Sequence, residues 1–107
     1  MDKLIEALQF IKQFMMNPDE EFPTACEHEI LYVNDVDLSK MTVEDVRKLH
    51  KLGFMVGDRD NDNYYLSDED GIYTNEYFDP DKITEEQWKK FRDSIDTCVS
   101  SYKYGSC

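Results

Sequence analysis

The sequence predicts an α+β fold of two layers, in which an antiparallel or mixed sheet of four to five strands packs against about three helices. Three observations support this: segments with helical periodicity, short β-prone runs between them, and an order in which the two kinds of segment are mixed along the chain. The 107 residues suit one hydrophobic core, so we expect residues 1–107 to form a single domain.

Three segments are predicted to be helical. Between residues 2 and 16, apolar residues recur every three or four positions, as on one face of an amphipathic helix. Thr42 and Asp45 resemble a capping box, and a short apolar face follows them. Thr84 and Gln87 form a closer match to that motif and open a third helix. The apolar stripe of that helix is expected to contain Trp88, Phe91, Ile95 and Cys98.

The remaining ordered segments are β-prone. Residues 29–33 form a compact apolar run, which indicates a central strand. The polar link 57–63 is rich in turn formers and predicts a hairpin between its flanks. The expected strands around and after that link are 54–56, 64–66 and 72–74, which together suggest a meander. The alternating residues 99–104 are expected to form the last strand.

The charge balance is strongly acidic. The chain has 24 Asp and Glu against 12 Lys and Arg, a formal charge of −12 at pH 7. Such a chain repels phosphates, so direct binding to DNA or RNA is disfavoured. The natural partners of this surface are basic proteins or cations.

Membrane insertion and export are not expected. No apolar run approaches the roughly 20 residues of a membrane-spanning helix, and the first residues lack the pattern of a secretory signal. The three cysteines, Cys26, Cys98 and Cys107, are an odd number at wide spacing. We therefore expect free thiols and a reducing cytoplasm.

Carboxylates and tyrosines alternate in one part of the chain. Tyrosine provides broad contact area at low entropic cost, and a field of one sign attracts a partner of the opposite charge. This segment is therefore the predicted partner-binding surface. Its members are Asp58, Asp60, Asp62, Tyr64, Asp68, Glu69, Asp70, Tyr73, Glu76, Tyr77, Asp79 and Asp81. The alternative is that the charges only keep the protein soluble while several tyrosines are half-buried core residues.

Two patterns suggest metal binding as an alternative function. Asp58, Asp60, Asp62 and Glu69 match positions one, three, five and twelve of an EF-hand calcium loop. Position six is Asn63 rather than glycine, and the flanking segments look extended rather than helical, so an acidic hairpin turn is the simpler interpretation.

The second pattern could hold structural zinc through Cys26, His28 and Cys107. The Cys-x-His spacing departs from the usual Cys-x-x-Cys knuckle, and packing of a small buried cysteine explains Cys26 equally well. A cysteine near a histidine can also be a nucleophile, yet no glycine-rich turn offers an oxyanion site. We expect no catalytic residues, no enzymatic activity and no cofactor.

Some short motifs resemble a group of small uncharacterised proteins encoded by bacteriophages and prophages. The similarity covers residues 20–58 and the last four residues. Its motifs are Cys26-Glu27-His28-Glu29 followed by Leu31 and Val33, then Val43 to Asp45, Leu49, Leu52, Gly53 and Phe54, and finally Tyr104-Gly105-Ser106-Cys107. The group has no assigned activity, and residues 59–97 depart from its pattern.

The resemblance implies a host cytoplasm. Small acidic phage proteins are similar in charge and size to inhibitors that occupy the DNA-binding or RNA-binding site of a host enzyme. The predicted function is therefore a stoichiometric binder of a basic host protein, acting as a nucleic-acid mimic from a phage or mobile element. A nucleic-acid-binding enzyme is one candidate partner, and the sequence does not indicate an oligomeric state.

Overall fold

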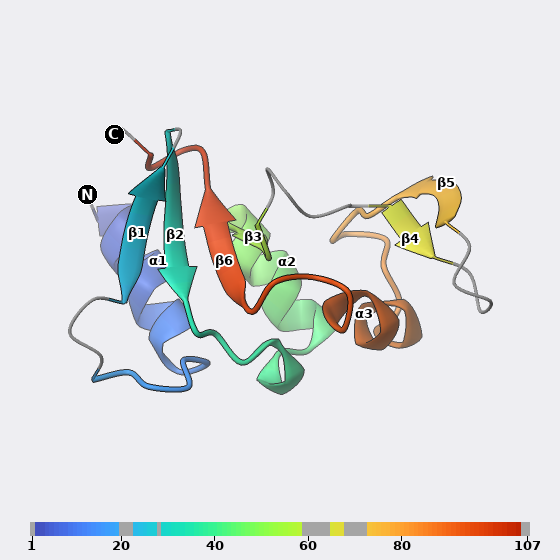
Figure 1. Ribbon diagram of the computed structural model, residues 1–107, viewed down its shortest axis with the longest axis horizontal. Helices are drawn as coiled ribbons and strands as arrows, with labels where there is room; N and C mark the ends of the chain where they lie inside the picture. Colours follow the sequence, from blue (N-terminus) through green and yellow to red (C-terminus); the bar gives the residue numbers. More distant parts are fainter. Residues whose placement is uncertain (1, 20–22, 28, 59–64, 68–72, 106–107) are drawn as a thin grey trace.

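The computed structural model describes residues 2–19, 23–27, 29–58, 65–67 and 73–105, with the backbone alone at 65–67 and 73–77. Its elements confirm the expected α+β fold (Figure 1). In chain order they are α1 (Asp2–Lys12), β1 (Thr24–Glu27), β2 (Ile30–Asn34), the 3₁₀ helix η1 (Leu38–Lys40), α2 (Val43–Lys51), β3 (Met55–Val56), β4 (Tyr65–Ser67), β5 (Tyr73–Tyr77), α3 (Glu85–Arg92) and β6 (Cys98–Ser101).

The main sheet has four strands in the order β1-β2-β6-β3, and all neighbours are antiparallel. The apolar run predicted at 29–33 is found as β2, which lies inside the sheet. Val33 pairs with Val99 of β6, and Val99 pairs in turn with Val56 of β3. Since facing residues of neighbouring strands share one side of a sheet, this register lines up a row of valines toward the core.

Helices α1 and α2 cover one face of this sheet and form the second layer (Figure 1). The core between the layers contains Ile11 of α1, Leu49 of α2 and Val99 of β6, each at most 1% exposed. Burial of such side chains is the main driving force for the fold, at roughly 25 cal/mol per Å² of apolar surface.

The predicted meander is wrong. Strand β3 does not pair with β4: it joins the main sheet beside β6, whereas β4 and β5 form a separate two-stranded sheet. The second sheet lies at the end of the molecule away from β1, next to α3 (Figure 1). The molecule is accordingly elongated, at 40 × 26 × 22 Å.

The helix boundaries also differ from the expectation. Helix α1 ends at Lys12 because the next residues leave the helix to pair with the segment after β2: Met15 forms a bridge with Val36, and the Met16 amide donates to the Asp35 carbonyl at 2.8 Å. Helix α3 ends at Arg92, so Cys98 belongs to β6 rather than to a helical stripe. Among the described residues, no helix is long and apolar enough to cross a membrane.

Candidate partner-binding surface

Residues 58–81, called the acidic arm below, carry most of the net negative charge of the chain. The arm has nine acidic residues and one arginine, a net charge of −8. The other 83 residues have fifteen acidic and eleven basic residues, a net charge of −4. A quarter of the chain therefore carries two thirds of the net charge, and the arm includes the strands of the separate small sheet.

The structure describes the two ends of the acidic arm. Asp58 is half-buried, Asp79 is partly exposed and Asp81 is exposed. Three predicted residues, Tyr73, Glu76 and Tyr77, lie on β5, of which only the backbone is described. The remaining predicted contact residues lie outside the described residues; they are Asp60, Asp62, Tyr64, Asp68, Glu69 and Asp70.

The first end of the arm is fixed to the main sheet. Gly57 has φ +73°, a conformation that favours glycine. Its amide donates to the Cys98 carbonyl at 2.6 Å, and its carbonyl accepts a hydrogen bond from the buried Ser100 hydroxyl at 2.8 Å. The next residue, Asp58, accepts a hydrogen bond from the Tyr32 hydroxyl at 3.1 Å. The arm therefore starts from a point tied to both β2 and β6.

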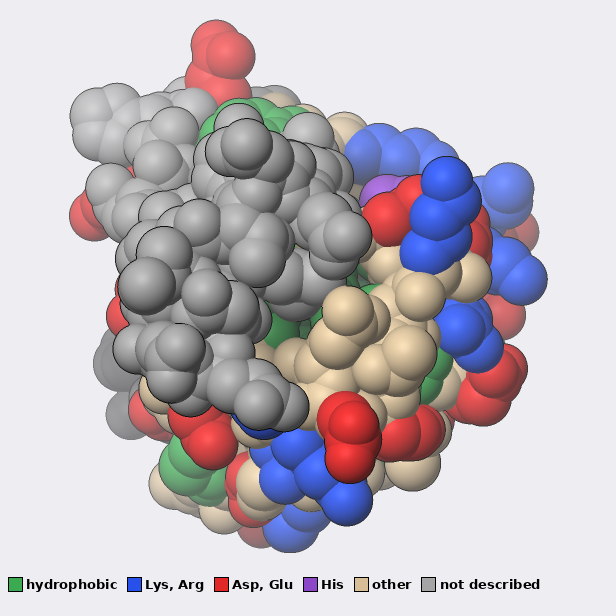
Figure 2. Space-filling model, turned by 90° about the vertical axis from the view of Figure 1, so that its right-hand side faces the viewer, with side chains coloured by type: hydrophobic (Ala, Val, Ile, Leu, Met, Phe, Trp, Pro, Cys, Tyr) green, Lys and Arg blue, Asp and Glu red, His purple; other side chains and the backbone are tan. Residues whose placement is uncertain are grey.

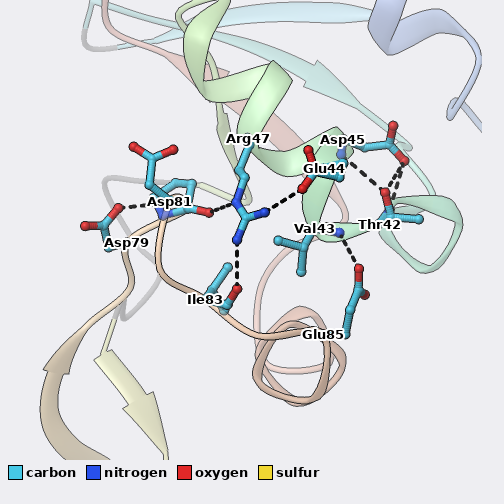
Figure 3. A network of polar contacts seen from close by, with 10 residues as sticks. Thr42, Val43, Glu44, Asp45, Arg47, Asp79, Asp81, Ile83 and Glu85 are labelled. Atoms are coloured by element: carbon cyan, nitrogen blue, oxygen red, sulfur yellow. Dashed lines mark hydrogen bonds and ion pairs between the residues drawn. The ribbon is translucent and has the colours of Figure 1, made fainter.

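The second end of the arm is fixed to α2 by one arginine (Figure 3). The Arg47 Nε donates to the Pro80 carbonyl at 2.9 Å, and Nη2 donates to the Ile83 carbonyl at 3.4 Å. Its Nη1 forms an ion pair with Glu44 at 2.6 Å. A turn at Asp79 completes this end, because its carboxylate accepts the amide of Asp81 at 3.0 Å.

Aromatic packing holds the same end from inside the molecule. Phe78 has no exposed surface and stacks on Phe91 of α3, with ring centroids 4.3 Å apart and planes 7° from parallel. Helix α3 is joined in turn to α2, since Glu85 accepts the Val43 amide at 3.1 Å (Figure 3). The Trp88 indole donates to the Met41 carbonyl at 2.8 Å in the core. The arm thus returns to a rigid junction between two helices.

A groove of about 480 Å³ opens beside the first end of the arm, on the face of the main sheet opposite to α1 and α2. Residues two apart on a strand point to the same side. Leu31 and Val33 face the core, so Tyr32 and Asn34 of β2 face this groove. Four carboxylates line it, and we call it the acidic groove: Glu27, Asp35, Asp58 and Asp96.

Three of these carboxylates were not expected at the site. Glu27, Asp35 and Asp96 lie far from the arm in sequence and are brought to it by the pairing of β1, β2 and β6. A sequence signal existed only for Asp35, which follows the predicted central strand. The groove extends the negative surface of the arm onto the main sheet.

The charged side chains around the small sheet are of mixed sign. Figure 2 shows this end of the molecule, where described Lys and Arg side chains lie interspersed with Asp and Glu. Among these side chains, Arg47 and Glu44 form an ion pair. The part of the chain outside the arm therefore has a smaller net charge than the arm, as the count of acidic and basic residues also indicates.

The metal predictions fall mostly on residues that the structure does not describe. Of the four predicted calcium ligands only Asp58 is described, so the calcium site stays a prediction. Among the described residues no group of three or more His, Cys, Asp or Glu side chains could hold a metal ion. Cys26 is disulfide-bonded, so the expectation of free thiols is wrong for this residue. A zinc site with Cys26, His28 and Cys107 would require that bond to be reduced. His28 and Cys107 lie outside the described residues.

Comparisons with known proteins returned no match: no family model, no curated protein and no solved structure resembles the chain significantly. The resemblance to small phage proteins therefore stays a prediction.

Proposed function

We propose that this protein binds a basic surface of another protein through its acidic arm, and that it acts there as a nucleic-acid mimic. The observation that carries the proposal is the charge of −8 within 24 residues, between two ends that are anchored to the folded body. A partner suited to this surface has a groove lined by Lys and Arg, as nucleic-acid-binding proteins do.

The anchoring supports the proposal on energetic grounds. Binding costs free energy when a segment has to be ordered, and a segment fixed at both ends has less freedom to lose. Asp58 is held by Tyr32, and Pro80 and Ile83 are held by Arg47. The acidic groove next to Asp58 continues the negative surface, so a basic partner can contact the arm and the sheet together.

The charge also predicts how binding proceeds. A field of one sign speeds the encounter with a basic partner, and salt screens it over about 8 Å at physiological ionic strength. Such a protein inhibits its partner by occupying the site in a one-to-one complex, and no catalytic step is needed. We place this binding in the cytoplasm of a host cell and the gene in a phage or mobile element.

The test uses capture from host lysate at low and high salt, with nuclease added to exclude bridging by nucleic acid. The arm variant Asp60→Asn/Asp62→Asn/Asp70→Asn loses three negative charges. The control variant Glu6→Gln/Glu86→Gln/Asp93→Asn loses the same charge from exposed positions outside the arm.

We expect the arm variant to bind the captured protein at least about tenfold more weakly at low salt, and the control variant to bind nearly as the wild type does. The captured protein should also lose its affinity for nucleic acid when the wild type is bound. Equal weakening by both variants would mean that overall charge, not the arm, drives binding. Binding that survives 1 M salt unchanged would contradict an electrostatic interface.

A further inference from the structure

A second groove, of about 280 Å³, lies between the end of α2, strand β3 and the chain around the end of β6. Part of its lining is apolar and well buried: Phe54 has no exposed surface, and Met55 is 8% exposed. Tyr102 also lines the groove, and its side chain is 46% exposed. An apolar hollow with an exposed aromatic ring beside it is suited to a ligand that has a flat apolar part.

The charge of this groove is opposite to that of the chain as a whole, so we call it the basic groove. His50 and Lys103 line it, and no described Asp or Glu does. In the whole chain, by contrast, 24 Asp and Glu stand against 12 Lys and Arg. The basic groove is therefore complementary to an anion, and it does not suit the basic partner proposed for the acidic arm.

Local contacts position both basic side chains. The Lys103 Nζ lies over the Tyr104 ring, 5.5 Å from its centroid. The His50 Nδ1 lies 3.1 Å from the Met55 sulfur. A thioether sulfur can only accept a hydrogen bond, so Nδ1 carries the hydrogen of this contact. The other ring nitrogen, Nε2, is then the one that can take up a proton and donate to an anion.

The backbone beside the groove is compatible with an anion. Carbonyl groups at the C-terminal end of a helix repel negative charge. The carbonyls of residues 48–50 in α2, however, accept hydrogen bonds from the amides of residues 52–54. Gly53 has φ +93°, and a Cβ atom there would lie 3.0 Å from the Lys103 side chain. Glycine at this turn therefore leaves room for the lysine stem beside the groove.

We propose that the basic groove binds a small aromatic carboxylate. The ring of the ligand lies against Phe54 and Met55, and its carboxylate is held by the Lys103 ammonium and the imidazolium of His50. A compact ammonium group and an imidazolium suit a carboxylate, whereas the described lining lacks the arginine fork that favours phosphate. The volume lies just below the roughly 300–1,000 Å³ of pockets for drug-sized ligands, so the ligand is small. This inference does not depend on the acidic arm or its partner.

The probe is phenylpropionate, and its controls are the uncharged phenylpropionamide and acetate, which lacks the ring. Binding to the full-length, isotope-labelled protein is followed by NMR. A ligand of this size should have a Kd of roughly 1 mM, with saturable shifts at the amides of Gly53, Met55 and Ser101. Each control should bind at least about threefold more weakly, because it lacks either the charge or the apolar surface. A control that binds as well as phenylpropionate would overturn the proposal, as would shifts that are absent or centred on the acidic groove.

Variants test the two basic side chains. Lys103→Met keeps most of the apolar stem and should weaken phenylpropionate at least about threefold, and His50→Gln/Lys103→Met at least about tenfold. The control variant Lys40→Met/Lys51→Met removes two exposed charges outside the groove and should change the affinity less than about twofold. Phenylpropionamide should bind all these forms alike, which separates a lost anion contact from a damaged fold. Equal weakening of phenylpropionate by the control variant would overturn the assignment, because net charge rather than the groove would then govern binding.

Discussion

The junction between the acidic arm and α2 can be tested by replacing Arg47 with methionine. Methionine keeps most of the apolar stem of arginine and removes the guanidinium group. The change removes the hydrogen bond to the Pro80 carbonyl at 2.9 Å, the longer one to the Ile83 carbonyl at 3.4 Å, and the ion pair with Glu44 at 2.6 Å. It leaves the rest of α2 intact.

The size of the effect follows from the exposure of each partner. The Glu44 side chain is 79% exposed, so its ion pair with Arg47, three residues away on the same helix, should contribute less than about 0.5 kcal/mol. The bond to the Pro80 carbonyl is part-buried and has a charged donor, for which about 1.5–3 kcal/mol is typical. The bond at 3.4 Å adds little. We expect Arg47→Met to lower the free energy of unfolding by about 2 kcal/mol.

Urea unfolding at neutral pH measures this difference, and Glu44→Gln is the matched control. The control removes the ion pair but keeps both carbonyl contacts, so its loss should stay below about 0.5 kcal/mol. Hydrogen exchange should also rise at the amides of Lys82 and Ile83, which donate to the Asp79 carbonyl in this turn. Equal losses in both variants would refute the reasoning, because the ion pair rather than the carbonyl contacts would then fix the arm.

Two further substitutions test the body that supports the arm. Trp88→Phe should lower the free energy of unfolding by about 2 kcal/mol in urea, because it leaves the buried Met41 carbonyl without its donor. A loss below about 0.5 kcal/mol would contradict that role for the indole. Asp37 accepts hydrogen bonds from Ser39, which lower the pKa of its carboxyl below the ordinary 3.8. A lowered pKa stabilises the fold above pH 3.8 and loses that contribution as pH falls through the folded-state value. Asp37→Asn keeps an oxygen that can accept and removes only the charge, so it should cost less than about 1 kcal/mol at pH 7 and progressively less below pH 3.8; a difference that is constant with pH would count against the carboxylate.

The helices could be predicted because their signals are local. Both capping boxes, at Thr42 with Asp45 and at Thr84 with Gln87, are formed as the sequence indicated. The end of α1 could not be predicted, because it depends on a bridge from Met15 to a residue that follows β2. The apolar period continues past the point where tertiary pairing ends the helix.

Strand pairing was predicted less well, for a physical reason. The turn-rich link at 57–63 favours a local hairpin, yet Met55 and Val56 pair with Ser100 and Val99, more than forty residues later. Strand β1 was missed altogether. All four of its residues are exposed at the edge of the sheet, so the sequence has no apolar pattern there from which a strand could be predicted.

The acidic groove could not be predicted either, because it also depends on pairing between strands that are distant in sequence. The nine acids of the arm are adjacent in sequence and could be found by counting, whereas Asp35 and Asp96 meet only because Asn34 pairs with Cys98 at the neighbouring positions. A shift of one residue in that register would turn Tyr32 toward the core and remove the hydrogen bond that fixes Asp58. The negative surface beside the arm therefore depends on the strand register. The buried row of Val33, Val99 and Val56 fixes this register, and in doing so it also positions the carboxylates on the opposite face of the sheet.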